Sequence, residues 1–510
     1  MGAMSSDHAN NIVLSAGKFD PDGGGLAGLK TLFAQIGSER PQRLVIHFHG
    51  GLVSREAGER DASELSPQYA LAGAKALFVI WETGWTEVVS QKLPRIFQED
   101  IFKRILRRVT QFVQGKLEKE LGPEGAKGID DELPLPFEQE VQEEIDKGKA
   151  GGQMFSDLPV DHFSSEVVSG PDESSLSAVE RQQIQAEIEN DTQLQEQVLS
   201  IAQSREPATE ATGKGEELTP VTSLIDEEKL NDIAPLQTPP GAPAPKAILS
   251  TIKLGKSIAV IVGAVIWRFA KKRDHGPYLT IVEEIMREFY VRAAGRFLWQ
   301  GMKDEVDGAF QPGANCGGTA LVMNLEEMWM AGIKPQVTLV GHSAGSIYIA
   351  RLLKELDDKL PGDFKVSVIL IAPACTFKVL ADSLEGAGKR VAGLRIFGMG
   401  DPVERKDAIV PLVYPASLLY FVSGVLEDDR DEPIVGMQRY YGVPYADAGF
   451  DDIASVRTFN YLERDHAFAW ALASGAYGAN CDMQSHGGWI RADQTRESVL
   501  YIIKNGYGYS

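Results

Sequence analysis

The sequence GHSAG at positions 341–345 places Ser343 between two glycines, each two positions away. The residues before it, 337–340, are mostly apolar or β-branched and predict a buried strand, while residues 346–356 repeat apolar side chains at helical spacing. A serine at a sharp turn between a strand and a helix presents its hydroxyl for attack, and the flanking glycines leave room for that turn. The pattern predicts a nucleophilic Ser343. The alternative is a glycine-rich turn with an incidental serine.

An unactivated serine is a poor nucleophile near neutral pH, so a neighbouring imidazole, oriented by a carboxylate, must take its proton. A search for these two partners is where the chain comes to resemble the α/β-hydrolase superfamily. In that superfamily the serine, the acid and the histidine of the triad follow in that order along the chain. The segments that carry the resemblance are HGGL at 49–52, GHSAG at 341–345, GMGDP at 398–402 and SHGGW at 485–489. Their flanking strands cover roughly residues 40–85 and 310–510, and the resemblance does not extend to residues 86–310.

Asp401 is the acid that we favour. An expected strand and a glycine turn precede it, which places its carboxylate at the carboxyl edge of a sheet. An aspartate before a proline is also common in simple turns. The fallback is a later group of acids, although such a cluster is typical of a solvated loop. Its members are Glu427, Asp428, Asp429 and Asp431.

Two histidines follow Asp401 in the chain. His486 lies in a glycine-containing loop shortly before the expected closing helix, where superfamily members similar to this chain keep their base. His466 lies closer to the last expected strand and is the alternative base. We therefore expect a catalytic triad of Ser343, Asp401 and His486.

The HGG sequence at 49–51 resembles the tract of esterases and lipases whose backbone N–H groups face the negative oxygen formed during the reaction. Glycines suit this loop because the chain must approach the substrate closely. His49 is expected to support the loop by hydrogen bonding. The residues expected to supply oxyanion-binding N–H groups are Gly50, Gly51, Leu52 and Ala344.

The apolar segments predict the α/β class, with a mostly parallel central sheet flanked by helices, and the resemblance implies the α/β-hydrolase fold. Strands are expected at 43–48, 75–82, 365–374, 394–397 and 456–462, and helices at 26–36, 96–113, 283–302 and 494–504. Residues 418–425 fit either a strand or a helix. The expected organisation is a flexible segment at 1–25, a core at 26–85 and 311–510, and a large, mainly helical cap at 86–310.

The acidic segment 118–241 holds 29 Asp and Glu against 8 Lys and Arg, so it carries the whole net charge of −21. Its apolar content is too low to offset the entropy of ordering it throughout, and we expect it to be partly disordered or loosely helical. It could act as a solvated spacer or bind a basic partner. The rest of the chain has 43 residues of each sign, which argues against a nucleic-acid partner.

Residues 258–267 form the most apolar run of the chain, and basic residues follow as far as position 273. A run of ten residues is too short to cross a bilayer as a helix, which takes about 20. Three interpretations stay open: a buried helix, a lid lining an acyl pocket, or an interfacial helix that makes 258–273 a peripheral membrane contact.

Taken together, these features predict a cytoplasmic serine hydrolase that acts on a small or lipid-like carboxylic ester. The three cysteines are widely spaced, without metal-ligand spacing or a disulfide framework, and the N-terminus lacks the pattern of a signal peptide. No motif implies a metal or an organic cofactor, and the oligomeric state stays open. The alternatives are another acyl-enzyme chemistry on the same triad, such as peptidase, thioesterase, amidase or acyltransferase, or a non-catalytic scaffold that uses its acidic insertion to bind a partner.

Overall fold

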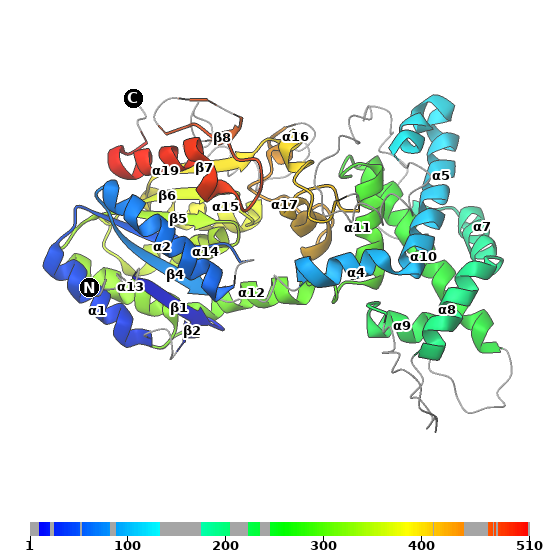
Figure 1. Cartoon of the computed structure of the whole chain (residues 1–510), viewed down its shortest axis with the longest axis horizontal. Helices are drawn as coiled ribbons and strands as arrows, with labels where there is room; N and C mark the ends of the chain where they lie inside the picture. Colours follow the sequence, from blue (N-terminus) through cyan, green and yellow to red (C-terminus); the bar gives the residue numbers. More distant parts are fainter. Residues whose placement is uncertain are drawn as a thin grey trace, which may run out of the picture.

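The structure is a computed structural model with two lobes (Figure 1). The sheet lobe, on the left in that view, contains the first strands and the closing helix of the chain. The helical lobe, on the right, is built from residues between 93 and 289. The structure describes residues 10–20, 25–51, 54–81, 88–132, 175–204, 223–234, 245–411, 413–442, 468–472, 474–475 and 478–507.

Within the described residues, one eight-stranded sheet organises the sheet lobe, in the order β2-β1-β4-β3-β5-β6-β7-β8. β2 runs antiparallel to β1, and every other neighbouring pair is parallel. The protein is therefore an α/β protein with a mostly parallel sheet. The strands are β1 (Asn11–Ser15), β2 (Lys18–Phe19), β3 (Arg43–Phe48), β4 (Lys75–Trp81), β5 (Gln336–His342), β6 (Val366–Ile371), β7 (Val391–Met399) and β8 (Phe468–Ala471).

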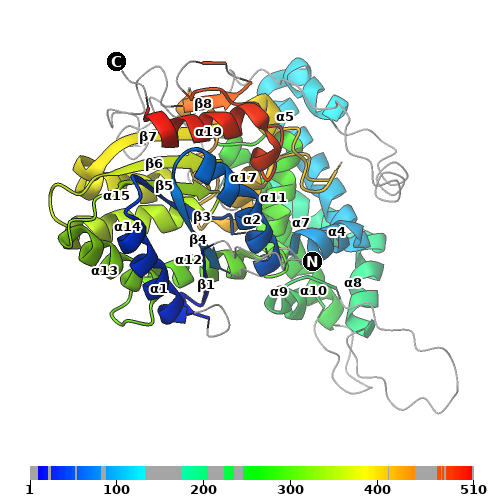
Figure 2. The same ribbon diagram turned by 60° about the vertical axis from the view of Figure 1, so that its left-hand side comes forward.

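Helices cover both faces of this sheet (Figure 2), which explains why its central strands are apolar along most of their length. Leu44 and Ile46 of β3 face one core, whereas Val45 between them faces the other. The first face is covered by α1 (Gly25–Glu39), α13 (Gly317–Met330), α14 (Gly345–Lys359) and α15 (Phe377–Ala387). The second face is covered by α2 (Arg55–Leu71) and α19 (Asp493–Asn505).

Because β3, β5, β6 and β7 are parallel, their carboxyl ends meet at one edge of the sheet, the usual place for a site in such folds. The segments that leave this edge run into α2, α14, α15 and α16 (Asp401–Glu404). Short helical turns complete the sheet lobe: η4 (Gly388–Arg390), η6 (Gln438–Tyr441) and η7 (Trp489–Arg491).

The helical lobe packs around α10 (Pro245–Ala270), which contacts four other helices of the lobe. Residues Ser250–Ala270 are long and apolar enough to cross a membrane, but two thirds of that window is buried inside the protein. The apolar run at 258–267 predicted only part of this helix, because the run continues an amphipathic segment that starts earlier in the chain. Most residues of the run at 258–267 are buried, as the first of the three interpretations expects. The other elements are η2 (Val88–Lys92), α4 (Leu93–Gln98), α5 (Asp100–Glu132), α7 (Ala178–Glu189), α8 (Thr192–Ser204), α9 (Glu227–Ile233) and α11 (Pro277–Phe289).

Buried charged side chains join the helical lobe to the segment after β7. Glu283 of α11 accepts hydrogen bonds from His275 Nδ1 at 2.7 Å and from the Tyr414 hydroxyl at 2.8 Å, and it pairs with Arg268 at 2.7 Å. His275 Nε2 donates to Asp431 at 2.9 Å. We call these five residues the junction network.

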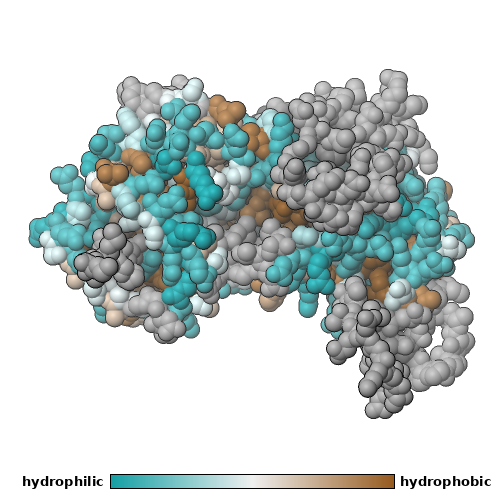
Figure 3. All heavy atoms as spheres, in the orientation of Figure 1, coloured by the Kyte–Doolittle hydropathy of each residue, from teal (hydrophilic) through white to brown (hydrophobic). Residues whose placement is uncertain are grey.

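The two lobes are also joined by α12 (Arg296–Ala309), α17 (Leu418–Phe421) and η5 (Val422–Leu426). Residues 418–425 are therefore helical, which decides between the two alternatives left by the sequence. The single helix expected at 283–302 was wrong, because the chain turns between α11 and α12 at Gly295, which has a φ of 89°. Figure 3 shows apolar side chains gathered between the lobes, on a surface that is otherwise largely hydrophilic.

The flexible segment expected at 1–25 was wrong for residues 11–19, which form β1 and β2 at the edge of the sheet. Only Ile12, Val13 and Leu14 are apolar and buried in β1, so the pattern was too short to predict a strand. β8 was missed for the same reason. The strand expected at 456–462 and most of the acidic segment lie outside the described residues.

Candidate active site

Ser343 lies at the turn between β5 and α14, with a φ of 50°. This left-handed backbone conformation is uncommon for a residue with a side chain and needs support from its surroundings. Hydrogen bonds of the Ser343 main chain supply this support. The Ser343 amide donates to the Ile371 carbonyl at 2.9 Å, and the Ser343 carbonyl accepts from the Ala374 amide at 3.1 Å and from the Ser346 hydroxyl at 2.6 Å.

The glycines on either side of the nucleophile have no room for a side chain. A Cβ at Gly345 would overlap the carbonyl oxygen of Phe48 at the end of β3. A Cβ at Gly341 would lie 2.7 Å from Ile349 and 3.1 Å from the main chain of Gly345. The turn at Ser343 is thus packed directly against the end of the strand that carries the HGG loop.

His486 is the histidine that the structure brings to Ser343. Its Nε2 lies 2.8 Å from Ser343 Oγ, and both side chains are buried. Burial, with a smaller contribution from His342, lowers the pKa of His486 to about 3. The imidazole is therefore neutral at pH 7 and can accept the serine proton. The main chain of His486 is held by two hydrogen bonds, from its amide to Asp407 at 2.7 Å and from His342 Nε2 to its carbonyl at 3.0 Å.

Asp401 is not brought to His486, contrary to the sequence expectation. Its carboxylate accepts hydrogen bonds from the Tyr420 hydroxyl at 2.6 Å and from Arg405 at 3.1 Å. The reason is that α16 begins at Asp401 and turns this side chain toward α17. The fallback acids do not hydrogen-bond to His486 either. Asp431 belongs to the junction network, and Glu427 binds the Trp299 indole at 2.7 Å.

Asp407 is the carboxylate that contacts His486, whose main-chain amide donates to Asp407 Oδ2. Burial raises the pKa of Asp407, and the hydrogen bond from His486 acts in the opposite direction. In the described part of the chain, Nδ1 of His486 is buried and has no hydrogen-bond partner. The sequence analysis missed Asp407 because it lies six residues beyond Asp401, the acid that directly follows the glycine turn.

The HGG loop lies against the nucleophile turn. A Cβ at Gly50 would lie 3.3 Å from Ser343 Cβ, and one at Gly51 would lie 2.9 Å from Ala344 Cβ. His49 supports this loop, since its Nδ1 donates to the Gly50 carbonyl at 2.5 Å and its Nε2 accepts from the Trp81 amide at 2.9 Å. The Ala344 amide donates to no acceptor among the residues that the structure describes. Leu52 and His466 lie outside the described residues.

No protein-family model, curated protein or solved structure matches this chain. The function is therefore inferred from the side chains of the site and their geometry. Among the described residues, no three His, Cys, Asp or Glu side chains are arranged to hold a metal ion. Cys316, Cys375 and Cys481 are buried and form no disulfide.

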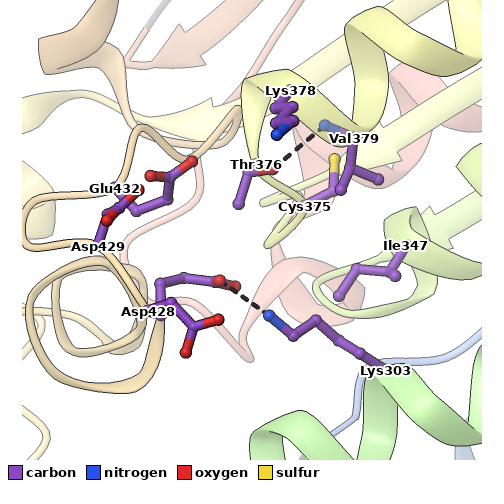
Figure 4. Close-up of a pocket in the computed structure, with 10 residues that line it drawn as sticks. Lys303, Ile347, Cys375, Thr376, Lys378, Val379, Asp428, Asp429 and Glu432 are labelled. Atoms are coloured by element: carbon purple, nitrogen blue, oxygen red, sulfur yellow. Dashed lines mark hydrogen bonds and ion pairs between the residues drawn. The ribbon is translucent and has the colours of Figure 1, made fainter.

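A pocket of about 180 Å³ lies beside α14, between α12, the start of α15 and residues 427–432 (Figure 4). Ile347 contributes to one wall, and carboxylates from residues 427–432 contribute to the opposite wall. The Ile347 amide bonds to the Ala344 carbonyl, so the pocket lies one helical turn from the nucleophile, although Ser343 does not line it. Neither α10 nor α11 contributes to this pocket, and most of the side chains that line it are charged. The lining residues are Lys303, Ile347, Cys375, Thr376, Lys378, Val379, Glu427, Asp428, Asp429 and Glu432.

Proposed function

We propose that this chain is a serine hydrolase that cleaves carboxylic esters through an acyl-enzyme. The observation that carries the proposal is the pair of Ser343 and His486. Ser343 is a buried serine on a left-handed turn, and its Oγ lies 2.8 Å from a neutral imidazole. A serine in this position has the neighbouring base that nucleophilic attack requires.

In the proposed reaction, Ser343 Oγ attacks the carbonyl carbon of the ester while its proton passes to His486 Nε2. The bond between the acyl carbon and the alcohol oxygen then breaks, and Nε2 returns the proton to the departing alcohol. Water attacks the acyl-enzyme next, giving its proton to the same nitrogen. Release of the carboxylic acid returns the proton to Ser343 Oγ.

Asp407 is the acid that we assign to this imidazole. When Nε2 accepts the serine proton, Nδ1 carries a proton that needs an acceptor, and that nitrogen is buried. Asp407 already binds the amide of the same residue at 2.7 Å. In this assignment the Asp407 carboxylate accepts a hydrogen bond from Nδ1 and stabilises the imidazolium that forms during catalysis.

The main-chain amides of Ala344 and of the HGG loop are the groups that we assign to the negative oxygen of the intermediate. Both lie beside Ser343, and the closest approach is made at glycine positions where a side chain would intrude. Amides fixed before the reaction stabilise the developing charge without reorganising, which is often the largest contribution to such catalysis.

We also propose the α/β-hydrolase fold for the sheet lobe. Its nucleophile turn follows a central strand of a mostly parallel sheet, and its glycine loop follows β3 and precedes α2. The reacting residues follow the order Ser343, Asp407 and His486. All three features match the arrangement that this superfamily uses.

The first test is labelling with a fluorophosphonate, which reacts with activated serines, followed by mass spectrometry of the modified peptide. We expect wild-type protein to be labelled at Ser343 and Ser343→Ala to lose the label. The same substitution should lower kcat/KM on p-nitrophenyl acetate by roughly 10⁴-fold or more, because the nucleophile is removed. Ser38→Ala, on the exposed end of α1, is the matched control and should label as wild type does.

Two outcomes would contradict the proposal. Folded wild-type protein that resists the probe, or that reacts at a different residue, would remove Ser343 as an activated nucleophile. A panel of esters, thioesters and peptides tests the substrate class separately. Turnover confined to thioesters or peptides would keep the mechanism but overturn the choice of ester.

A further inference from the structure

His342, the residue just before the nucleophile, contacts both loops that complete the site. Its Nε2 donates to the His486 carbonyl at 3.0 Å. Its Nδ1 edge faces Gly50, where an added Cβ would lie 2.9 Å from that nitrogen. The His342 ring centroid is 5.3 Å from that of His486 and 6.3 Å from that of Trp489. One side chain thus lies between the base loop and the HGG loop.

The hydrogen bonds decide the protonation state of His342. A carbonyl oxygen only accepts, so Nε2 must carry a hydrogen. Burial lowers the pKa of His342 to about 4, although the His486 carbonyl acts in the opposite direction, so the ring is neutral at pH 7. His342 therefore serves as a fixed donor to the main chain of His486, while His486 is the ring that faces the serine hydroxyl.

The position of the His486 imidazole depends mainly on hydrogen bonds made by the His486 main chain. His486 belongs to no helix or strand, and the only side chain that its imidazole bonds in the described part of the chain is Ser343. Two anchors hold the main chain, Asp407 on the amide and His342 on the carbonyl. Loss of either anchor frees one side of the residue that must stay within 3 Å of Ser343 Oγ.

We propose that His342 is a positioning residue, which fixes the His486 imidazole against Ser343 through its hydrogen bond to the His486 carbonyl. This inference rests on the proposed serine-hydrolase function. Displacing a reacting group by about 1 Å costs roughly 100-fold in rate, so a single lost anchor should be measurable.

Two substitutions separate this hydrogen bond from packing. In His342→Gln, the side-chain N–H lies as many bonds from the main chain as Nε2 does, so it can still reach the His486 carbonyl. In His342→Asn, the N–H lies at the position of Nδ1 and cannot. Both variants lose the aromatic ring, so a role in packing alone predicts that they behave alike.

The experiment measures fluorophosphonate labelling at Ser343, kcat and KM on p-nitrophenyl acetate, and hydrogen–deuterium exchange of the peptide that contains His486. We expect His342→Asn to lower the labelling rate and kcat by roughly 10- to 100-fold with little change in KM, and to accelerate exchange in that peptide. His342→Gln should stay within about 3-fold of wild type in rate and should keep wild-type exchange.

The inference is overturned if the two variants lose activity equally, or if His342→Asn leaves both the rate and the exchange of the peptide unchanged. Failure of the proposed function is seen separately, because wild-type protein would then not be labelled. In that case the exchange comparison of the two variants alone decides whether His342 holds the His486 loop.

Discussion

Asp407 and Asp401 lie six residues apart, yet only Asp407 contacts the proposed base. We expect Asp407→Asn to lower kcat on p-nitrophenyl esters by roughly 100-fold or more, because an amide cannot stabilise the imidazolium that forms during attack. Asp401→Asn is the matched control and should stay within a few-fold of wild type. Steady-state kinetics of both variants at pH 7.5 provide the measurement. A larger loss in Asp401→Asn than in Asp407→Asn would return the role of the acid to Asp401.

The pairing of Ser343 with His486 could be predicted at the residue scale, because the signals for both residues are local. GHSAG predicts a sharp turn whose glycine positions have no room for larger side chains. The expected order of serine, acid and histidine along the chain narrows the choice of histidine. Asp407 could not be predicted in this way, because its selection depends on how α16 turns the chain after β7. His342 lies within the GHSAG motif, but the positioning role that we propose for it depends on the carbonyl of His486, which lies 144 positions later in the chain.

The junction network determines how the helical elements attach to the sheet lobe. Glu283 is fully buried, pairs with Arg268 and hydrogen-bonds to His275. Removing one charge of a buried ion network weakens the electrostatic compensation of its partners, and breaking a buried pair in this way costs about 3–5 kcal/mol. We therefore expect Glu283→Gln to lower the free energy of unfolding by about that amount, measured with urea.

The matched control for this prediction is Asp232→Asn, which breaks the ion pair with Lys253 between α9 and α10. Both partners of that pair are nearly half exposed, at 46% and 44%, so its loss should cost less than about 1 kcal/mol. Equal effects of the two substitutions would show that burial does not set the strength of the junction network.

At the scale of elements, the long apolar segments were predictable, because a strand covered on both faces is apolar throughout. β3 was expected at 43–48 and spans Arg43–Phe48. The short strands β1 and β8 were not predictable, since a run of three or four apolar residues does not make a distinct pattern. The break between α11 and α12 was not predicted either. It occurs at a turn at Gly295, but the apolar residues on both sides keep helical spacing across that turn.

At the scale of the whole molecule, four imidazoles near the site make stability depend on pH. Burial lowers the pKa values of His47 and His486 to about 3 and those of His49 and His342 to about 4. Their usual value is 6.5, so between about pH 6.5 and pH 4 the unfolded chain binds protons that the folded protein does not. These groups therefore contribute stability that is full above pH 6.5 and is lost as the pH falls.

Two variants test this, and we expect them to change the pH dependence of the free energy of unfolding in opposite directions. His47→Gln removes one such group and should make the free energy of unfolding less dependent on pH between pH 7 and 4.5. Burial and the neighbouring carboxylates of Glu427 and Asp429 raise the pKa of Glu432 to about 7. As the pH falls, the folded protein therefore binds a proton at Glu432 before the unfolded chain does. Glu432→Gln should therefore make the loss of stability at low pH steeper. Urea titrations at three pH values provide the measurement, and identical slopes in both variants would contradict the assignment.

The pairing of β5 with β3 has a consequence for how this protein is made. β3 ends roughly 290 residues before β5 begins, so β1, β3 and β4 leave the ribosome long before their central partner exists. At 5–20 residues per second the delay is roughly 15–60 s. During this interval one edge of β3 has no neighbouring strand, and an exposed apolar edge readily pairs with other chains. The nascent protein is therefore most prone to aggregate before its nucleophile strand has been synthesised, and a chaperone acting at that stage should increase its yield.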